Sequence, residues 1–139
     1  MLESFDRYRR SGINLALGTD TYPHDMVREM GFASLISRIA EKNFQVGTAG
    51  YVFNAATLGG ARALRRDDLG RLAPGAKADM VVLDLRKLHL GLIRDPIKAL
   101  CEFGSSANIE TVIIDGRTVV SGGQVVGRDE AKLFEAGQR

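Results

Sequence analysis

The side chains that could take part in chemistry gather behind one short apolar run, Ile13–Leu17. Asp20 follows this run closely, and Thr21 and His24 lie in the loop that comes next. A run of this length with a glycine on each side predicts a buried strand rather than a helix. Ligands of α/β proteins bind at the carboxyl ends of strands, so Asp20 is the first candidate for catalysis. An Asp in this position is also a common turn former or helix cap, and this alternative stays open.

The other candidate ligands and nucleophiles are scarce. The chain has two histidines, His24 and His89, and one cysteine, Cys101. A metal centre built mainly of imidazole or thiolate cannot be completed from these residues, so any metal chemistry must borrow ligands. His24 could contact a substrate, although a histidine in a loop before a helix is also a common solvated or capping group. We expect His89 to be structural, and Cys101 to be a core residue because it has helical spacing from Ile97.

The elements expected around Asp20 occur in the order helix, strand, helix, which is typical of repeated β/α units. Leu2, Phe5 and Tyr8 recur every third residue, which predicts a helix that Gly12 ends. After the strand and its loop, Asp25 can cap a helix over about Met26–Lys42. One face of this helix is apolar and consists of Met26, Met30, Ala33, Ile36 and Ala40. Phe32, Leu35 and Ile39 widen that face, so we expect both flanks of the helix to be packed against other elements.

Two further helices are expected before the chain turns to strands. Thr48 predicts the N-cap of a short helix through Phe53, and Asn54 predicts the N-cap of a second helix over Ala55–Leu64. Gly59-Gly60 inside that helix costs about 1 kcal/mol per glycine, so the pair indicates the close approach of another backbone.

The second half of the chain carries turn and strand signals. Its expected elements are a type II turn at Pro74-Gly75, a buried strand over Met80–Leu83, a helix opened by Asp95-Pro96 and ending at Phe103, and a three-strand meander through Val126 with turns at Asp115-Gly116 and Gly122-Gly123. Asp129 is expected to cap a last helix that docks through Leu133 and Phe134.

Composition sets wider bounds. The chain has 139 residues, 45% of them hydrophobic and 26% charged, which is ordinary for a globular protein. The net charge is +2 and the basic residues are scattered, so nucleic acid is not an expected partner. No apolar run reaches the roughly 18 residues of a membrane span, so no membrane association is expected. A single cysteine fits a reducing compartment, and the expected location is the cytoplasm.

Three separate motifs, in order and spacing, resemble the C-terminal part of the amidohydrolase superfamily. They are Leu17-Gly18-Thr19-Asp20, then Asn54–Thr57 with Gly59–Leu64, then Leu69–Gly75 with Lys77–Val82. The tail over Ile109–Val120 is similar to the closing hairpin of that family, so the resemblance covers nearly the whole chain. The branch it resembles is that of cytosine deaminases and triazine chlorohydrolases, which are metal-dependent hydrolases.

The resemblance implies an α/β fold in two parts. Residues 1–66 would be the C-terminal fragment of a (β/α)8 TIM barrel, with its last strand and the helices that follow. Residues 67–139 would be the C-terminal segment of a small β-sandwich domain with a closing helix. Asp20 matches the aspartate of the last barrel strand, which binds the divalent metal, zinc or iron, and acts as general base for the attacking water. Thr21 and His24 would lie at the rim of the substrate pocket.

The implied parent enzyme hydrolyses carbon-nitrogen bonds, or carbon-halogen bonds, of a small heterocyclic substrate. The family takes its histidine ligands from a His-x-His pair on the first strand and from the fifth and sixth strands, and none of these segments occurs in this sequence. A β/α barrel needs about 250 residues, so the chain is expected to be the final third or so of a longer enzyme. Alone, it is expected to be inactive and to bind no catalytic metal.

A rival hypothesis belongs to another functional class. A lone barrel strand between amphipathic helices exposes edges and apolar faces, so the chain could serve as a structural or dimerisation module without catalysis. Under either hypothesis we expect a homo-oligomer.

Overall fold

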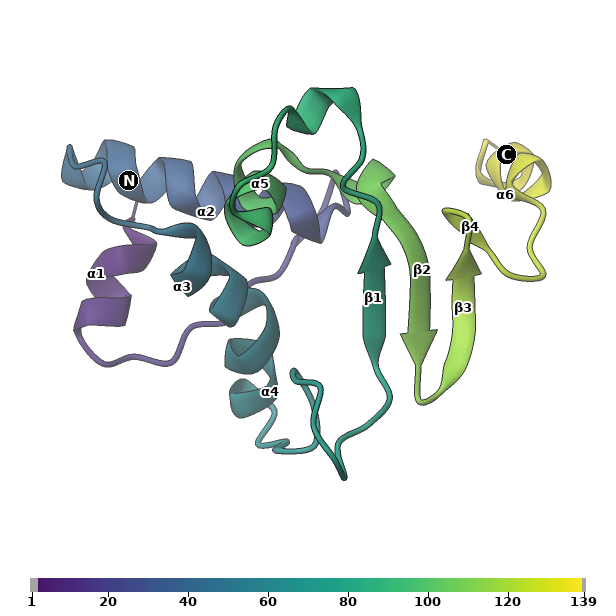
Figure 1. Ribbon diagram of the computed structural model, residues 1–139, viewed down its shortest axis with the longest axis horizontal. Helices are drawn as coiled ribbons and strands as arrows, with labels where there is room; N and C mark the ends of the chain where they lie inside the picture. Colours follow the sequence, from purple (N-terminus) through teal and green to yellow (C-terminus); the bar gives the residue numbers. More distant parts are fainter. Residues whose placement is uncertain (1–2, 139) are drawn as a thin grey trace.

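The structure is a computed structural model that describes residues 3–138. Most of the helices gather on one side of an antiparallel sheet, and the C-terminal helix lies beyond the other side of it (Figure 1). The helices are α1 (Phe5–Arg10), α2 (Met26–Glu41), α3 (Ala49–Asn54), α4 (Gly60–Ala63), α5 (Pro96–Phe103) and α6 (Glu130–Gly137), with a π-helical turn η1 (Ala55–Gly59) and two 3₁₀ turns, η2 (Leu88–Leu90) and η3 (Ser106–Asn108). The strands are β1 (Met80–Leu83), β2 (Ile109–Ile114), β3 (Arg117–Ser121) and β4 (Gln124–Val125).

Helix α2 begins and ends where the capping signals predict. The side chain of Asp25 accepts hydrogen bonds from the backbone N–H groups of Val27 and Arg28, and Lys42 adopts a left-handed conformation with φ 50° at the other end. One flank of α2 is buried, through Val27, Met30, Ser34 and Ser37. The other flank is not, because Phe32, Leu35 and Ile39 are exposed. The prediction that both flanks are packed is therefore wrong for this chain.

Helices α3 and α4 are two parts of one continuous helical rod joined by η1. The prediction that Asn54 caps a new helix is wrong, because Asn54 has helical angles, φ −62° and ψ −36°, and its side chain makes no capping hydrogen bond. The predicted close approach of a backbone at Gly59 is confirmed. A Cβ on Gly59 would overlap the carbonyl oxygen of Leu15, whereas a Cβ on Gly60 would meet open space. The Asn14 side chain also donates to the Gly59 carbonyl at 3.0 Å.

The sheet has the strand order β1-β2-β3-β4, and all neighbouring strands are antiparallel. Asp115 and Gly116 both have positive φ, 49° and 77°, as a tight hairpin turn between β2 and β3 requires. The meander is therefore confirmed, although β4 ends at Val125. Within residues 3–138 these strands form a single sheet, so a second layer of a sandwich is not part of the described chain.

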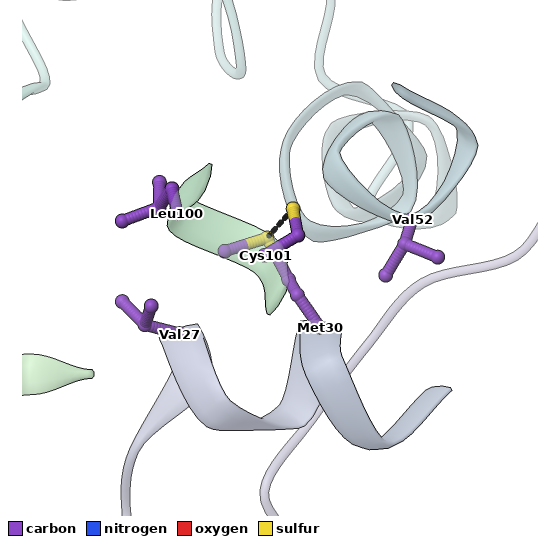
Figure 2. Close-up of a cluster of buried hydrophobic side chains, with 5 residues drawn as sticks. All are labelled: Val27, Met30, Val52, Leu100 and Cys101. Atoms are coloured by element: carbon purple, nitrogen blue, oxygen red, sulfur yellow. Dashed lines mark hydrogen bonds between the residues drawn. The ribbon is translucent and has the colours of Figure 1, made fainter. Parts of the chain in front are cut away.

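The core lies where α2, α3 and α5 meet. Its buried members are Val27, Met30, Val52, Leu100 and Cys101. Figure 2 shows Cys101 and Met30 pointing toward each other, with 3.8 Å between their sulfur atoms. Helix α5 lies between β1 and β2 in sequence but packs on the helices, so the two halves of the chain share one core. Cys101 is 2% exposed, which confirms its prediction as a core residue.

The strand predicted for Ile13–Leu17 is not formed. This segment is in neither a helix nor a β-ladder, and Ile13 is 51% exposed. A strand needs backbone hydrogen bonds from a neighbouring strand, and the described residues bring none beside this segment. Leu17 still packs against the core, so the segment is held by side chains rather than by a ladder.

The two ends of the chain agree with expectation only in part. The N-terminal helix is confirmed as α1, with Gly12 at φ 77° just after it, but Leu2 lies outside the described residues. Asp129 caps α6 as predicted, by accepting from the Lys132 N–H. The predicted docking of α6 is wrong, because Leu133 and Phe134 are both exposed. None of the helices in the described part of the chain is long and apolar enough to cross a bilayer.

Candidate functional site

Asp20 occupies an unusual backbone conformation at the start of the loop before α2. Its φ is 56°, in the left-handed region that residues with a Cβ seldom adopt. The N–H of Thr21 donates to the carbonyl of Thr19 at 2.6 Å, so the chain reverses tightly around Asp20. The Asp20 side chain is exposed. Strained residues of this kind cluster at functional sites, and the conformation presents this carboxylate at the tip of a turn.

The other candidates, Thr21 and His24, lie in the same exposed loop. The His24 ring stacks on the ring of Tyr22, with centroids 5.1 Å apart and planes within 5° of parallel. Sequence reasoning did not single out Tyr22, although aromatic residues two apart in a proline-containing loop are a signal for such a stack. The loop thus places a carboxylate, a hydroxyl and a flat aromatic pair next to one another along the chain.

Asp25 ends this loop and anchors it. One carboxylate oxygen caps α2, while the other accepts the N–H of Ser106 in η3 at 2.9 Å. Burial of Asp25 alone would raise its pKa, but the hydrogen bonds from Ser106, Arg28 and Val27 outweigh burial and hold the pKa of this carboxyl below its ordinary value. The cap was predictable, but the link to Ser106 was not, because its partner lies 81 residues away.

A second polar anchor holds the start of the sheet. Asn108 is buried, accepts the N–H of Ser105 at 3.1 Å and donates to the Asp84 carbonyl at 3.1 Å. The His89 Nε2 lies 3.2 Å from the same Asn108 side chain, which gives His89 a structural partner far from the candidate loop in sequence. No motif in the sequence marks Asn108 for this role.

The described residues do not by themselves fit a catalytic metal. Residues 3–138 contain no group of three or more His, Cys, Asp or Glu side chains that could hold an ion. A catalytic zinc site takes about three protein ligands and one open position, and Asp20 would supply one of them. Cys101 adds none, since burial and then the nearby Glu102 and Asp95 raise the pKa of its thiol to about 11.

Comparison with known proteins gives consistent matches. The model of the Amidohydrolase family matches residues 2–119. A 5-methylthioadenosine/S-adenosylhomocysteine deaminase of Pelotomaculum thermopropionicum is 36% identical over 134 residues, which are 94% of this chain and 31% of that protein. A 5'-deoxyadenosine deaminase of Methanothermobacter thermautotrophicus is 38% identical over 133 residues, which are 93% of this chain and 31% of that protein.

Solved structures match over the same extent. An adenosine deaminase of Xanthomonas campestris with bound zinc superposes with a TM-score of 0.88 at 27% identity, over 94% of this chain and 31% of that one. The atrazine chlorohydrolase of Arthrobacter aurescens, complexed with zinc, superposes with a TM-score of 0.83 at 26% identity, over 96% of this chain and 31% of that one. The chain therefore spans about a third of the length of the relatives it matches.

Proposed function

The chain belongs to the Amidohydrolase family, and we propose that it supplies the water-activating carboxylate, Asp20, to a metal-dependent hydrolase whose other ligands lie outside these residues. The proposed reaction is the hydrolysis of a carbon-nitrogen bond in a small heterocyclic substrate. Deaminases among the relatives support this class of reaction, and the chlorohydrolase supports a carbon-halogen bond as a variant.

The observation that carries the proposal is the backbone of Asp20. A non-glycine residue at φ 56° is held there by its surroundings, and such residues are enriched at active sites as well as in turns. The exposed Asp20 side chain makes no ion pair among residues 3–138, so it is free to face groups that another segment brings. A structural cap would instead be occupied, as Asp25 is.

The chemistry that a carboxylate offers here is proton transfer. Asp20 would accept a proton from water as the oxygen bonds to the ring carbon, and would then pass that proton to the departing amine. The carbon-nitrogen bond breaks and ammonia leaves with the proton, so no oxidant or other reactant is needed. Thr21 and His24 would contact the substrate at the rim, where the flat Tyr22–His24 pair suits a heterocycle.

The proposed architecture follows from the same family. Residues 1–66 would form the end of a β/α barrel domain and residues 67–139 the end of a composite β-sandwich. In that setting Ile13–Leu17 would pair with strands on both sides. We propose that the parent enzyme binds a divalent metal, as the zinc-bound relatives do, and that the isolated chain neither binds it nor turns over substrate.

A chimera tests this proposal. This chain replaces the matching part of the Pelotomaculum relative, and deamination of methylthioadenosine and zinc content are measured for the chimera and for the chain alone. We expect activity and zinc in the chimera and neither in the chain alone. Stoichiometric zinc on the monomeric chain would contradict the proposal that the other metal ligands lie outside this chain.

A non-catalytic structural or dimerisation module is the second candidate. It rests on the row of exposed apolar residues on α2, Phe32, Leu35 and Ile39, which in the first candidate would face the rest of the barrel. An inactive but well-folded chimera, with a self-associating chain, would favour this candidate.

A further inference from the structure

The candidate loop before α2 consists of two tight turns, one centred on Asp20 and one on His24. In each turn the N–H of the residue after the centre donates to the carbonyl of the residue before it, at 2.6 Å around Asp20 and at 2.8 Å around His24. Such three-residue turns shape the loop but do not fix where it lies on the rest of the molecule. Among residues 3–138, the backbone hydrogen bonds of residues 19–24 reach no further than Asp25. A hydrogen bond that ties this loop to the scaffold must therefore act through Asp25.

Asp25 ties this end of the loop to two separate elements. The residue is only 7% exposed, although the loop before it is exposed throughout. Its Oδ1 accepts the N–H groups of Val27 and Arg28, each at 3.1 Å, and so caps α2. Its Oδ2 accepts the N–H of Ser106 in η3 at 2.9 Å. A helix cap needs only the first oxygen, so the bond to Ser106 has a separate role.

Ser106 is a firm point of attachment because η3 is itself held in place. Asn108 is 1% exposed, and its side chain accepts the Ser105 N–H and donates to the Asp84 carbonyl, each at 3.1 Å. Asp84 directly follows β1, and its N–H donates to the Asn108 carbonyl at 2.8 Å. A buried polar network with its partners in place is rigid. The end of β1 thus holds η3, and η3 holds Asp25.

The same contacts leave Asp25 no chemistry of its own. Both of its carboxylate oxygens accept N–H groups, and the Arg28 side chain lies 3.6 Å from Oδ2. A general base or a metal ligand needs an oxygen that faces the substrate or the ion. Asp25 can therefore influence a reaction only through the loop that precedes it.

We propose that Asp25 is a positioning residue whose bond to Ser106 fixes Asp20 and His24 relative to the second half of the chain. The effect on catalysis rests on the proposed function of Asp20, whereas the hydrogen bond itself does not. A shift of a reacting group by about 1 Å lowers the rate about a hundredfold. The half of the chain that carries the sheet holds none of the candidate site residues, yet through this bond it sets the geometry of the loop.

Asp25→Ser separates the two roles of this side chain. Serine caps a helix about as well as aspartate does, so α2 keeps its cap, but serine has no second oxygen for the Ser106 N–H. Asp95→Ser is the matched control at the N-cap of α5. Asp95 accepts the Lys98 N–H at 3.0 Å, and its side chain makes no second hydrogen bond among the described residues.

Backbone order parameters from ¹⁵N relaxation of the isolated full chain measure whether the loop is held, without any catalysis. In the unmodified chain we expect values of about 0.85 for residues 19–24, as in rigid backbone. In Asp25→Ser the values for the loop should fall below about 0.6, while those of α2 stay unchanged because its cap remains. Asp95→Ser should change neither the loop nor α2.

The chimera with the Pelotomaculum relative measures the consequence for catalysis. Asp25→Ser should lower kcat per bound zinc by about tenfold to a hundredfold, because Asp20 is no longer held in place, and Asp95→Ser should leave it unchanged. A merely structural role of Asp25 would lower the amount of folded, zinc-loaded enzyme but not kcat per zinc.

Loop order parameters that stay near about 0.85 in Asp25→Ser would overturn the proposal, as would a loop already below about 0.6 in the unmodified chain. An unchanged kcat per zinc would overturn it too. If Asp25→Ser unfolds the chain, Ser106→Pro breaks the same bond from the other side and should give the same result, because proline lacks the N–H and is tolerated at the start of a helical turn. An inactive unmodified chimera would contradict the proposed function alone, and the order parameters then decide this inference.

Discussion

The packed helices and the candidate loop are opposite in character, although they adjoin in sequence. Helices α2, α3 and α5 bury apolar side chains of both halves of the chain around Leu100 and Cys101. The segment from Ile13 to His24, in contrast, has no ladder and exposes each of the residues proposed for chemistry. The scaffold therefore finds its contacts within the chain, whereas the site depends on contacts that these residues do not supply.

The helical core can form within this chain, whereas the segment that carries Asp20 needs neighbouring strands to form its own hydrogen bonds. A core closes when enough apolar area meets, and three helices achieve that here. A strand inside a parallel sheet cannot form alone, because its hydrogen bonds go to both neighbours. The hydrogen bonds of Asp25 to Ser106 and of Asn14 to Gly59 still hold the two ends of the segment against the scaffold.

The largest change in the free energy of unfolding is expected from a substitution in the helical core. Leu100→Ala should lower the free energy of unfolding by about 2–5 kcal/mol, because it leaves a cavity between packed helices. Leu64→Ala removes the same atoms from an exposed position and should change the free energy of unfolding by less than about 0.5 kcal/mol. Urea denaturation of both variants measures the difference. Equal effects would show that the helices do not form the core described here.

A pair of adjacent glycines tests how closely the segment lies against the scaffold. Gly59→Ala should destabilise the chain by about 1–3 kcal/mol, because the new Cβ would overlap the Leu15 carbonyl. Gly60→Ala should stabilise it by about 0.5–1 kcal/mol, since Gly60 has helical angles and open space beside it. Thermal unfolding compares the two. A stabilising Gly59→Ala would mean that the segment does not contact η1.

The anchor at Asp25 should give a smaller, pH-dependent effect. Asp25→Asn keeps an oxygen for the α2 cap but turns an amide donor toward the Ser106 N–H, and should cost about 1–2 kcal/mol at pH 7. Because folding lowers the pKa of Asp25, its contribution is present above the ordinary aspartate pKa of about 3.9 and is lost as the pH falls through the folded value. The variant should therefore show a shallower loss of stability in acid.

The control for Asp25 is Asp95→Asn, at the exposed N-cap of α5. Asp95 accepts from the Lys98 N–H, and asparagine caps as well as aspartate does, so little change is expected. Some acid dependence should remain in Asp25→Asn. Asp6 is also buried, and although burial opposes it, the hydrogen bonds from Arg9 and Gly47 lower its pKa. An unchanged acid slope in Asp25→Asn would argue against the link to Ser106.

Local chemistry made much of the fold predictable. Asp25, Asp95-Pro96 and Asp115-Gly116 act on backbone atoms within three residues of themselves, so their caps and turns can be inferred from the sequence. Asn54 misled the prediction because a good capping residue is also tolerated inside a helix when packing continues the helix through it.

Contacts between distant residues account for what was not predicted. The link of Asp25 to Ser106 and the hydrogen bonds of Asn108 depend on the folded topology, and no spacing in the sequence encodes them. The apolar run at Ile13–Leu17 has the composition of a strand, but a strand forms only beside a neighbour. The position of Asp20 after this run was predictable, while its positive φ was not.

The most direct test of the central claim is the catalytic efficiency of the chimeric enzyme with Asp20→Asn. The substitution keeps size and hydrogen bonding but removes the proton acceptor, so kcat/KM for methylthioadenosine should fall about 10²–10⁴-fold while the protein stays folded. Asp67→Asn, in an exposed aspartate outside the loop, should leave kcat/KM unchanged. An Asp20→Asn chimera as active as its parent would contradict the claim that this chain supplies the water-activating carboxylate.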